Sequence, residues 1–254
     1  MRSAVRLIIM RRWILLGRYD MADSYVALDL EMTGLKPRED RIIEIGAVKV
    51  IDGKAAESFS TLINPRMELP ERITEITGIC QQELEDAPDI EDVLEPLSDF
   101  MGNLPLLGHR ILFDYSFLKR AMINHKFSFE KRGIDTLALS RKYLPELPSK
   151  RLEDMCLYYR IPQQAHRAME DARAAHLLYG KIKQQFLRED NRQDFEPRQL
   201  IYKVKKETPA SEKQKKRLSE LIEKHKLVID VEIQSMTKNE VSRLTDKILA
   251  KYGR

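Results

Sequence analysis

Residues 25–51 read YVALDLEMTGLKPREDRIIEIGAVKVI, and each end of this stretch is a run of residues that favour β-structure. The first run is YVALDLE (25–31), and the second is IIEIGAVKVI (42–51). A third run, SFSTLIN (58–64), follows after a short turn. Three such runs in succession predict three strands that form a β-meander.

Helical periodicity dominates the chain after these strands. Apolar residues recur at helical spacing in four segments, 90–101, about 113–125, 151–159 and 168–188. The short runs PLLGH (105–109) and IDTLALS (134–140) lie between them and read as strands. Strands that come first and then alternate with helices predict an α/β fold, with a mixed central sheet of about five strands flanked by helices.

The composition of the 254 residues indicates a folded protein with charges of both signs. Apolar residues make up 43% of the chain and charged residues 33%, which excludes a disordered polyelectrolyte. Two cysteines, Cys80 and Cys156, are too few for a disulfide framework and lack the spacing of a zinc site, so a reducing cytoplasm is expected.

The net charge of +4 is unevenly distributed along the chain. Residues 1–20 (+4) and 201–254 (+6) are basic, which leaves −6 for residues 21–200. A basic tail on an acidic body favours a polyanionic partner for the tail and metal-binding carboxylates in the body.

Residues 1–22 read as an extension ahead of the first strand. Arginines interrupt their apolar runs, so they fit neither a membrane span nor the unbroken apolar centre of a secretory signal. Met21 directly precedes the first convincing strand. We therefore expect residues 1–20 to come from an over-extended start, and we expect no membrane association.

The remaining chain divides into a large body and a small C-terminal unit. Residues 23–188 form the body, and the charged, aperiodic residues 189–208 read as a linker. Residues 209–254 hold two capping-box patterns, each followed by an apolar helical stripe: Ser211-x-x-Gln214 and Thr237-x-x-Glu240. These patterns predict a small, basic helical hairpin.

Two carboxylates stand at the end of the first strand. The period of two places Asp29 and Glu31 on one face, while Leu28 and Leu30 point to the other. Two like charges this close repel unless a cation or a proton lies between them, and oxygen ligands favour Mg²⁺ or Mn²⁺. A solvated face of an edge strand is the alternative interpretation.

A third carboxylate borders a buried helical stripe. Asp114 stands four residues before Leu118 in FDYSFLKRAM. Burying part of a carboxylate without a partner costs several kcal/mol, so Asp114 either caps the helix N-terminus or binds a metal.

His166 and Asp171 form a third feature, in HRAMEDARAAHLLY. Their side chains converge only if His166 lies in the loop before the helix and Asp171 in its first turns. Histidine can accept a proton near neutral pH, so His166 is a candidate base. A surface histidine next to an N-terminal aspartate that the helix dipole stabilises is the alternative.

Four carboxylates and one base in the order strand, helix, helix make the chain resemble the DEDDh 3′-5′ exonucleases. This DnaQ-like family includes the proofreading ε subunit of bacterial DNA polymerase III and the exonuclease part of PolC. The matching motifs are ALDLEMTGL with IIEIGAVKV, then GHRILFDYSFL, then HRAMEDA, and they cover roughly residues 23–188. The resemblance implies an RNase H-like fold for the body.

The resemblance also implies a reaction and a set of site residues. It implies hydrolysis of single-stranded or mispaired 3′ ends of DNA to nucleoside 5′-monophosphates, in replication proofreading or repair. Two Mg²⁺ or Mn²⁺ ions would be held by Asp29, Glu31, Asp114 and Asp171, with His166 as general base. Residues near the motifs are expected to bind the substrate: Met32, Thr33, Gly34, His109, Arg110 and Phe117.

Two positions depart from the family pattern. Family members often have Thr after the first Glu and His-Asn before the second motif, whereas this chain has Met32 and His109-Arg110. Met32 makes LEMTGL similar to oligoribonuclease, so a 3′-5′ exonuclease acting on short RNA is one alternative. Arg110 would meet a substrate phosphate or pair with a surface acid.

Partners and a second alternative follow from the rest of the chain. A non-catalytic, polymerase-accessory protein that binds nucleic acid and keeps this fold is the second alternative, and the presence of all five catalytic-type residues argues against it. A DNA polymerase is one candidate partner. A sliding clamp is another, because Gln199-Leu200-Ile201-Tyr202 resembles a clamp-binding peptide. Basic residues of the hairpin would contact phosphates or form a solvated face: Lys213, Lys215, Lys216 and Arg217.

Overall fold

The structure, a computed structural model, describes residues 23–163, 166–204, 208–228 and 232–253. They form two compact units, which divide between Lys203 and Val204. The extension at 1–22, with the expected over-extended start, lies outside the described residues. Among the helices of the described ranges, none is long and apolar enough to cross a membrane.

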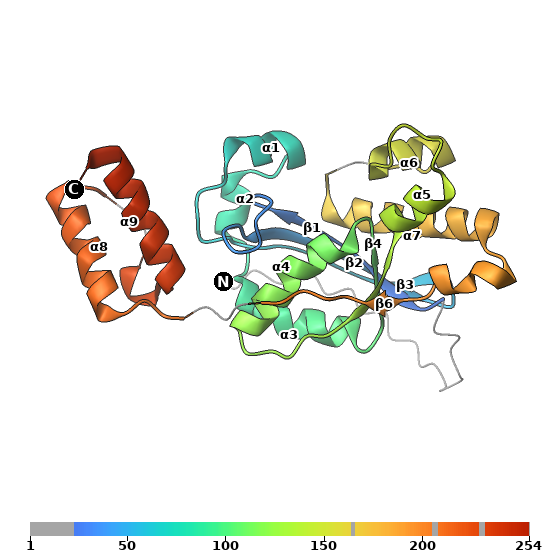
Figure 1. Cartoon of the computed structure of the whole chain (residues 1–254), viewed down its shortest axis with the longest axis horizontal. Helices are drawn as coiled ribbons and strands as arrows, with labels where there is room; N and C mark the ends of the chain where they lie inside the picture. The colour runs from blue at the N-terminus through green and yellow to red at the C-terminus, as the bar shows by residue number, and fades with distance from the viewer. Residues whose placement is uncertain (1–22, 164–165, 205–207, 229–231, 254) are drawn as a thin grey trace. The chain divides into compact units, whose positions relative to one another are not determined.

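A six-stranded mixed sheet forms the centre of the first unit (Figure 1). Its strands lie in the order β3 (Lys54–Leu62), β2 (Ile42–Ile51), β1 (Tyr25–Met32), β4 (Leu106–Gly108), β5 (Arg132–Asp135) and β6 (Arg198–Gln199). β2 pairs antiparallel with both β1 and β3, so the predicted meander is confirmed. β1 pairs in parallel with β4, and β4 with β5, which makes the sheet mixed as predicted.

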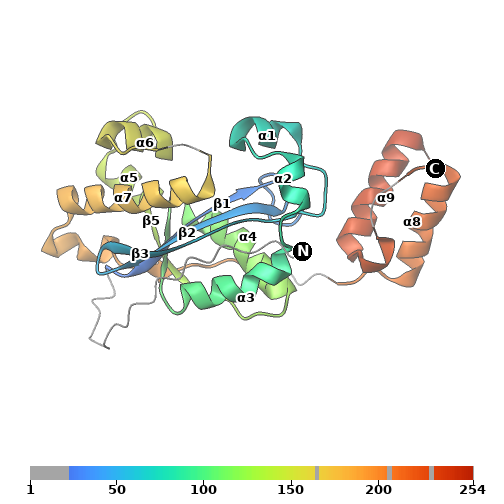
Figure 2. The same ribbon diagram turned by 180° about the vertical axis from the view of Figure 1, so that it is seen from behind.

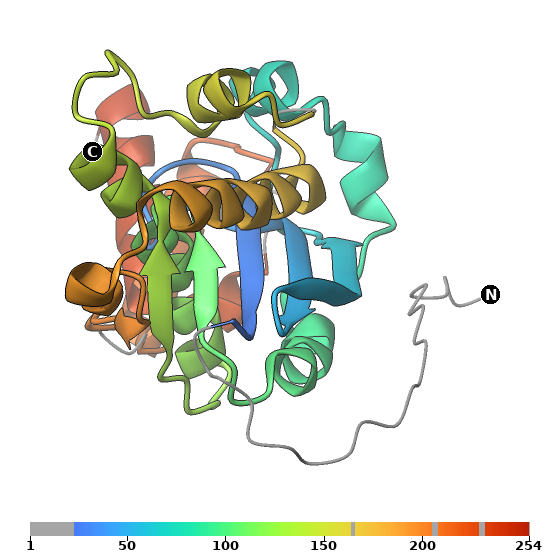
Figure 3. The same cartoon turned by 90° about the vertical axis from the view of Figure 1, so that its right-hand side faces the viewer.

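Helices cover both faces of this sheet (Figures 1 and 3). One face packs against α3 (Ile90–Met101) and α4 (Ile111–Asn124), and Figure 2 shows this layer from behind. The other face packs against α7 (Ala168–Phe186), which also contacts α5 (Thr136–Tyr143) and α6 (Leu152–Tyr159). Two short helices that the sequence did not predict, α1 (Glu71–Thr77) and α2 (Gln81–Glu85), close a small apolar cluster around Ile43.

The alternation of side chains along β1 decides where its carboxylates point. Leu28 and Leu30 belong to the apolar cluster beneath α3 and α4, whereas Ala27 belongs to the cluster beneath α7. Asp29 and Glu31 continue the register of Ala27, because side chains alternate with a period of two. Both carboxylates therefore lie on the α7 side, at the carboxyl end of the strand.

The segment 134–140 is mostly helical, so the prediction of a strand there is wrong beyond Asp135. β5 ends at Asp135, and α5 begins at the next residue. The Asp135 carboxylate caps the helix by accepting hydrogen bonds from the backbone N–H groups of Leu137 (2.9 Å) and Ala138 (3.3 Å). A strong N-cap directly after the strand turns the apolar run into a helix.

Residues 189–203 pack on the first unit, which corrects the linker predicted at 189–208. They contain the 3-10 helix η1 (Glu189–Asp194) and the edge strand β6, which pairs with β5. Phe195 and Leu200 are buried, and a Cβ at Gly133 would lie only 2.8 Å from the Leu200 side chain. Because Leu200 is buried, the segment that resembles a clamp-binding peptide presents no exposed leucine anchor.

The second unit is a helical hairpin. α8 (Glu212–Lys224) and α9 (Lys238–Tyr252) pack through an apolar cluster that includes Leu218 and Ile248. Both capping boxes are present, at Ser211 and at Thr237, and a 3-10 turn, η2 (Ile233–Ser235), precedes the second helix. Of the basic residues on α8, Lys215 is paired with Glu212 at 3.0 Å.

The contribution of the last strand to the first unit is testable at two neighbouring positions. Leu200→Ala removes a buried side chain and is expected to lower the free energy of unfolding by about 2–4 kcal/mol. Ile201→Ala is the matched control, because Ile201 is 72% exposed and its loss should change little. Urea unfolding followed by circular dichroism compares the two, and equal stabilities would show that residues 189–203 are a free linker after all.

Candidate active site

Asp114 approaches the end of β1 from the first turn of α4. The α4 N-cap is Arg110, which has a left-handed backbone (φ 73°), so Asp114 lies inside the helix and does not cap it. Its carboxylate is buried and accepts a hydrogen bond from the backbone N–H of Leu30 at 3.2 Å. The donor, Leu30, stands between Asp29 and Glu31 on β1, so this bond ties Asp114 to the strand that carries both carboxylates. Asp114 therefore belongs to a site shared with them and is not a helix cap.

Asp171 and His166 meet at the start of α7, as the sequence predicted. α7 begins at Ala168, which leaves His166 in the preceding loop with a left-handed backbone (φ 65°) and Asp171 in the first turns. The backbone N–H of His166 donates to Asp171 Oδ2 at 3.1 Å, and the Gln163 side-chain amide donates to Oδ1. A left-handed non-glycine residue is rare and is held here by its surroundings, a pattern that is common at functional sites.

The predicted carboxylates and the histidine converge. Glu31, His166 and Asp171 each offer a ligand atom, and these atoms all lie within 4.8 Å of one another. The charges of Asp114, Asp171 and Glu31 raise the pKa of Asp29, so Asp29 belongs to the same cluster. The cluster lies at the carboxyl end of β1, the edge at which α/β sheets bind their ligands.

Burial raises the pKa values of all four carboxyl groups, and the charges of nearby acids raise them further. Desolvation is the largest cause in each case, followed for Asp29 by the charge of Asp114, and the pKa of Asp29 is raised well above its usual range. The pKa of Glu31 rises to about 8 and that of Asp114 to about 7. The pKa of Asp171 is also raised, against the hydrogen bonds from Gln163 and His166. Without a cation, this cluster therefore holds protons near neutral pH.

The donor set fits hard divalent cations. Carboxylate oxygens predominate, and Mg²⁺ and Mn²⁺ prefer such ligands over nitrogen or sulfur. A bound cation would relieve the repulsion that raises these pKa values, and protons would leave as it binds. Residues Asp29, Glu31, Asp114 and Asp171 are therefore suited to hold metal ions, with His166 at the rim, where its side chain is 45% exposed.

The sequence interpretation missed three charged residues beside this cluster. Glu44 on β2 is almost fully buried, lies opposite Glu31 in the β1–β2 ladder, and pairs with Arg167 at 2.9 Å. Glu153 on α6 places Oε1 3.5 Å from Nε2 of His166. The sequence marks Glu44 as the one acid among the ten residues of IIEIGAVKVI, but it does not indicate the distant residue with which Glu44 pairs.

The loop after β1 closes on itself beside the site. Thr33 is buried, and its hydroxyl accepts a hydrogen bond from the backbone N–H of Arg41 at 3.0 Å. A Cβ on Gly34 would lie 2.6 Å from the carboxylate of Asp40, which also accepts from the backbone N–H of Lys36 at 2.7 Å. Of the two predicted substrate-binding residues Thr33 and Gly34, only Gly34 is partly exposed. Any direct contact of these two residues with a substrate would therefore involve Gly34 and its backbone.

His109 and Arg110 behave differently, although they are neighbours. Both ring nitrogens of His109 are hydrogen-bonded, to the Thr136 hydroxyl at 2.9 Å and to the Lys150 carbonyl at 2.7 Å, and burial lowers its pKa. His109 therefore ties loops together rather than offering a nitrogen to a ligand. Arg110 is exposed, and its guanidinium lies 5.0 Å from the centre of the Phe113 ring.

Two residues that the sequence predicted to bind the substrate have side chains buried in the core. Met32 and Phe117 are 9% and 3% exposed, and both belong to the apolar cluster beneath α3 and α4. Met32 continues the register of Leu28 and Leu30, so its side chain points away from the carboxylates. The residue that gives the likeness to oligoribonuclease therefore packs in the core.

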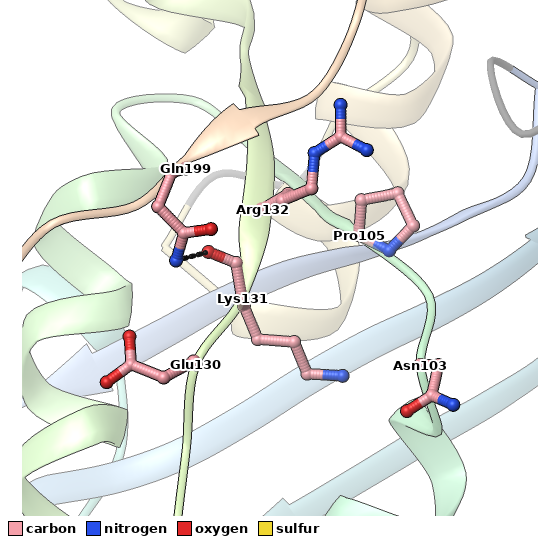
Figure 4. Close-up of a pocket in the computed structure, with 6 residues that line it drawn as sticks. All are labelled: Asn103, Pro105, Glu130, Lys131, Arg132 and Gln199. Atoms are coloured by element: carbon pink, nitrogen blue, oxygen red, sulfur yellow. Dashed lines mark hydrogen bonds between the residues drawn. The ribbon is translucent and has the colours of Figure 1, made fainter.

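A hollow elsewhere on the first unit lies away from these carboxylates. It is lined by Pro105, which precedes β4, and by Lys131, which precedes β5, together with Gln199 of β6 (Figure 4). The Gln199 amide donates to the Lys131 carbonyl at 3.2 Å, the bond drawn in Figure 4. These residues stand at the amino ends of the parallel strands, opposite to the carboxyl ends that carry the acidic cluster.

The raised pKa values predict how stability depends on pH and on metal. The pKa values of Glu31 and Asp114 rise from 4.5 and 3.8 to about 8 and about 7, so the metal-free folded protein binds more protons than the unfolded chain between these limits. Its free energy of unfolding should therefore fall as pH rises from about 4 to about 8. Thermal unfolding in EDTA should show this fall, and added Mg²⁺ should reverse it.

Substitution of one carboxylate tests the cause. Asp29→Asn removes one of the repelling charges without changing shape, so in EDTA at alkaline pH it should unfold at a higher temperature than the unsubstituted protein. Asp99→Asn makes the same exchange at an exposed position of α3 and should leave the pH dependence unchanged. An Asp29→Asn protein that is less stable at every pH would contradict the assigned repulsion.

The first unit of the chain is similar in sequence to known proteins. Residues 26–179 match the family RNase_T, described as Exonuclease. The DNA polymerase III PolC-type of Clostridium perfringens is 37% identical over 153 residues, which are 60% of this chain and 11% of that protein. The corresponding protein of Thermotoga petrophila is 41% identical over 155 residues, 59% of this chain and 11% of that protein. The match thus spans about a tenth of these relatives.

Solved structures agree with the fold. Escherichia coli Exonuclease I in complex with a dA16 oligonucleotide superposes with a TM-score of 0.57 at 21% identity, covering 64% of this chain and 41% of that one. Exonuclease X in complex with 5′ overhanging duplex DNA gives a TM-score of 0.51 at 25% identity, covering 63% of this chain and 92% of that one. The chain therefore belongs to the RNase T exonuclease family, and its first unit is a 3′-5′ exonuclease domain of the DnaQ and PolC type with the RNase H-like fold.

Proposed function

We propose that the first unit hydrolyses the 3′-terminal phosphodiester of single-stranded or mispaired DNA and releases nucleoside 5′-monophosphates. The observation that carries this proposal is the convergence of Glu31, His166 and Asp171 within 4.8 Å, with Asp29 and Asp114 in the same electrostatic cluster. A shared edge of acidic groups with one histidine is suited to phosphoryl transfer, which depends on positioning and on neutralising charge.

The roles of the side chains follow from their chemistry. Asp29, Glu31, Asp114 and Asp171 would hold two Mg²⁺ or Mn²⁺ ions, which supply Lewis acidity toward the phosphodiester when bound. His166 would take the proton of the attacking water, because it lies beside Asp171 and is partly exposed. Glu153, 3.5 Å from the His166 ring, would hold that ring in orientation.

DNA is the substrate we favour. The relatives that are 36–41% identical are named as DNA polymerases III of the PolC type, and the similar structures include exonucleases in complex with DNA. The one feature that favoured short RNA was Met32, and its side chain is buried in the core. Proofreading of a replicative polymerase, or repair of mispaired ends, is the corresponding role.

Cleavage from a labelled end tests the proposal. With Mg²⁺ or Mn²⁺, a 5′-labelled single-stranded oligonucleotide should shorten one nucleotide at a time, and a mispaired 3′ end should be trimmed faster than a paired one. Asp29→Asn should give no ladder, because one ligand carboxylate is lost while the fold is kept. A ladder that persists in Asp29→Asn or in EDTA would contradict the site.

The same assay separates the alternatives. Oligonucleotides of two to five ribonucleotides, degraded in preference to matched DNA, would move the chain to the RNA exonucleases. Binding of DNA with no cleavage under any metal condition would favour the non-catalytic accessory protein.

Arg110 is expected to contact a backbone phosphate. Its exposed guanidinium lies at the N-terminus of α4, next to Asp114 in the first turn, and it forms no ion pair with an acidic side chain of the described residues. Arg110→Ala should raise KM for single-stranded DNA and reduce the salt slope of log KM by roughly 0.7–1, with little change in kcat.

A matched control accounts for the loss of charge alone. Lys54→Ala removes one exposed positive charge at the start of β3, beside the turn that precedes it and far along the sheet from the carboxyl end of β1. KM and the salt slope should stay unchanged in this variant. An equal effect of both substitutions would show that Arg110 acts through overall charge and not through a phosphate contact.

A further inference from the structure

Glu44 is a buried acid in a position where an acid is unfavourable. It is 3% exposed, and it lies directly opposite Glu31 in the antiparallel ladder of β1 and β2. Its charge raises the pKa values of both Glu31 and Asp29, which already repel their neighbours. Like charges directly opposite each other destabilise a sheet, so Glu44 requires a compensating contact.

Arg167 supplies that contact. Its Nε and a terminal nitrogen lie 3.2 Å and 2.9 Å from Glu44 Oε1, and Nε lies 3.3 Å from Oε2. Burial of one partner and a fork-like geometry make such a pair stronger than a surface ion pair. Arg167 is also the N-cap residue of α7 and stands next to His166 in the chain.

Glu44 holds the backbone of the same helix turn as well. Oε2 accepts a hydrogen bond from the backbone N–H of Ala168 at 3.0 Å, one of the donors that a helix N-terminus leaves without an intrahelical partner. Both carboxylate oxygens are thus occupied, which leaves Glu44 a poor metal ligand despite its place beside the cluster.

Gly46 allows this close approach of helix and strand. A Cβ at Gly46 would lie 2.1 Å from the Ala168 carbonyl carbon and 2.2 Å from the backbone nitrogen of Met169. Gly46 is also the partner of Asp29 in the ladder. The first turn of α7 therefore rests on the backbone of β2 at the two positions that face Asp29 and Glu31.

We propose that Glu44 and Arg167 are positioning residues, which clamp the first turn of α7 to β2 and thereby set His166 and Asp171 at the distance from Asp29 and Glu31 that the reaction requires. This inference rests on the proposed function. It assigns Glu44 no contact with the substrate or with metal. Its effect is transmitted through the Ala168 N–H and through Arg167, which adjoins His166.

An ordinary stabilising ion pair is the competing explanation, and the chain offers a matched comparison. Lys119 and Glu130 also pair at 2.8 Å with one buried and one exposed side chain, and they lie between α4 and the start of β5, away from the cluster. Glu130→Gln therefore removes a similar pair without touching the first turn of α7. Its activity should equal that of the unsubstituted protein, whatever it does to stability.

Steady-state kinetics on single-stranded DNA provide the first test. Glu44→Gln and Arg167→Met should each lower kcat by roughly 10–100-fold with little change in KM, the size of effect typical of residues that orient metal-site groups. The double variant should have a kcat no lower than that of the less active single variant, because both substitutions remove the same Glu44–Arg167 pair. Arg167→Lys, which restores the charge but not the fork, should recover part of the lost kcat.

Amide hydrogen exchange provides a second test that does not depend on activity. In Glu44→Gln and Arg167→Met the peptide containing Ala168 and Asp171 should exchange faster, while the C-terminal half of α7 keeps its protection. Arg167 is 42% exposed on its side chain, so Arg167→Met should fold even if a substitution at Glu44 does not.

The outcomes separate this inference from the function on which it rests. If the unsubstituted protein gives no ladder, the proposed function fails, and hydrogen exchange still reports whether the pair holds the turn. If the unsubstituted protein is active while folded Arg167→Met and Glu44→Gln keep its kcat, the positioning role is refuted. Equal losses of kcat in Glu130→Gln would likewise reduce the pair to a general stabilising contact.

Discussion

Four carboxyl groups gathered at the end of one strand repel one another, and the surrounding structure compensates for this repulsion. Asp29 and Glu31 stand two residues apart on β1, Asp114 reaches them from α4, and Asp171 reaches them from α7. Burial and the charges of nearby acids raise the pKa of each group, so the folded state is less stable here than an apolar cluster would be. A cluster of this kind is suited to a divalent cation, which would relieve the repulsion.

The sheet provides the rigidity that this arrangement needs. β1 is central, paired on one side with β2 and on the other with β4, and it is buried on both faces. The Leu30 N–H fixes Asp114 from within the strand, while the contacts of Glu44 and the space at Gly46 bring the start of α7 against β2. Backbone N–H groups thus hold Asp114 and Asp171, while Asp29 and Glu31 stand on the central strand itself.

Much of this site could be predicted from the sequence, because its parts are local. The period of two put Asp29 and Glu31 on one face, and the separation of His166 and Asp171 in the sequence required a loop before the helix, which the structure has.

Contacts between segments that are distant in the sequence could not be predicted. Phe117 and Met32 were assigned by adjacency to motifs, whereas packing made them core residues. Glu44 was missed because its importance lies in Arg167, 123 positions away. The strand β6 was missed because its two residues, Arg198 and Gln199, are polar and lie in charged sequence without a periodic signal.

Proton release on metal binding tests the central claim most directly. Titration calorimetry of the unsubstituted protein with Mn²⁺ at neutral pH, repeated in buffers of different ionisation enthalpy, counts the protons that leave as the ion binds. Because the pKa values of Glu31 and Asp114 lie at about 8 and about 7, saturable binding should be accompanied by proton release, and Asp29→Asn should weaken the binding. Binding that releases no protons, or that is unaffected by Asp29→Asn, would show that the four carboxylates do not act as one metal site.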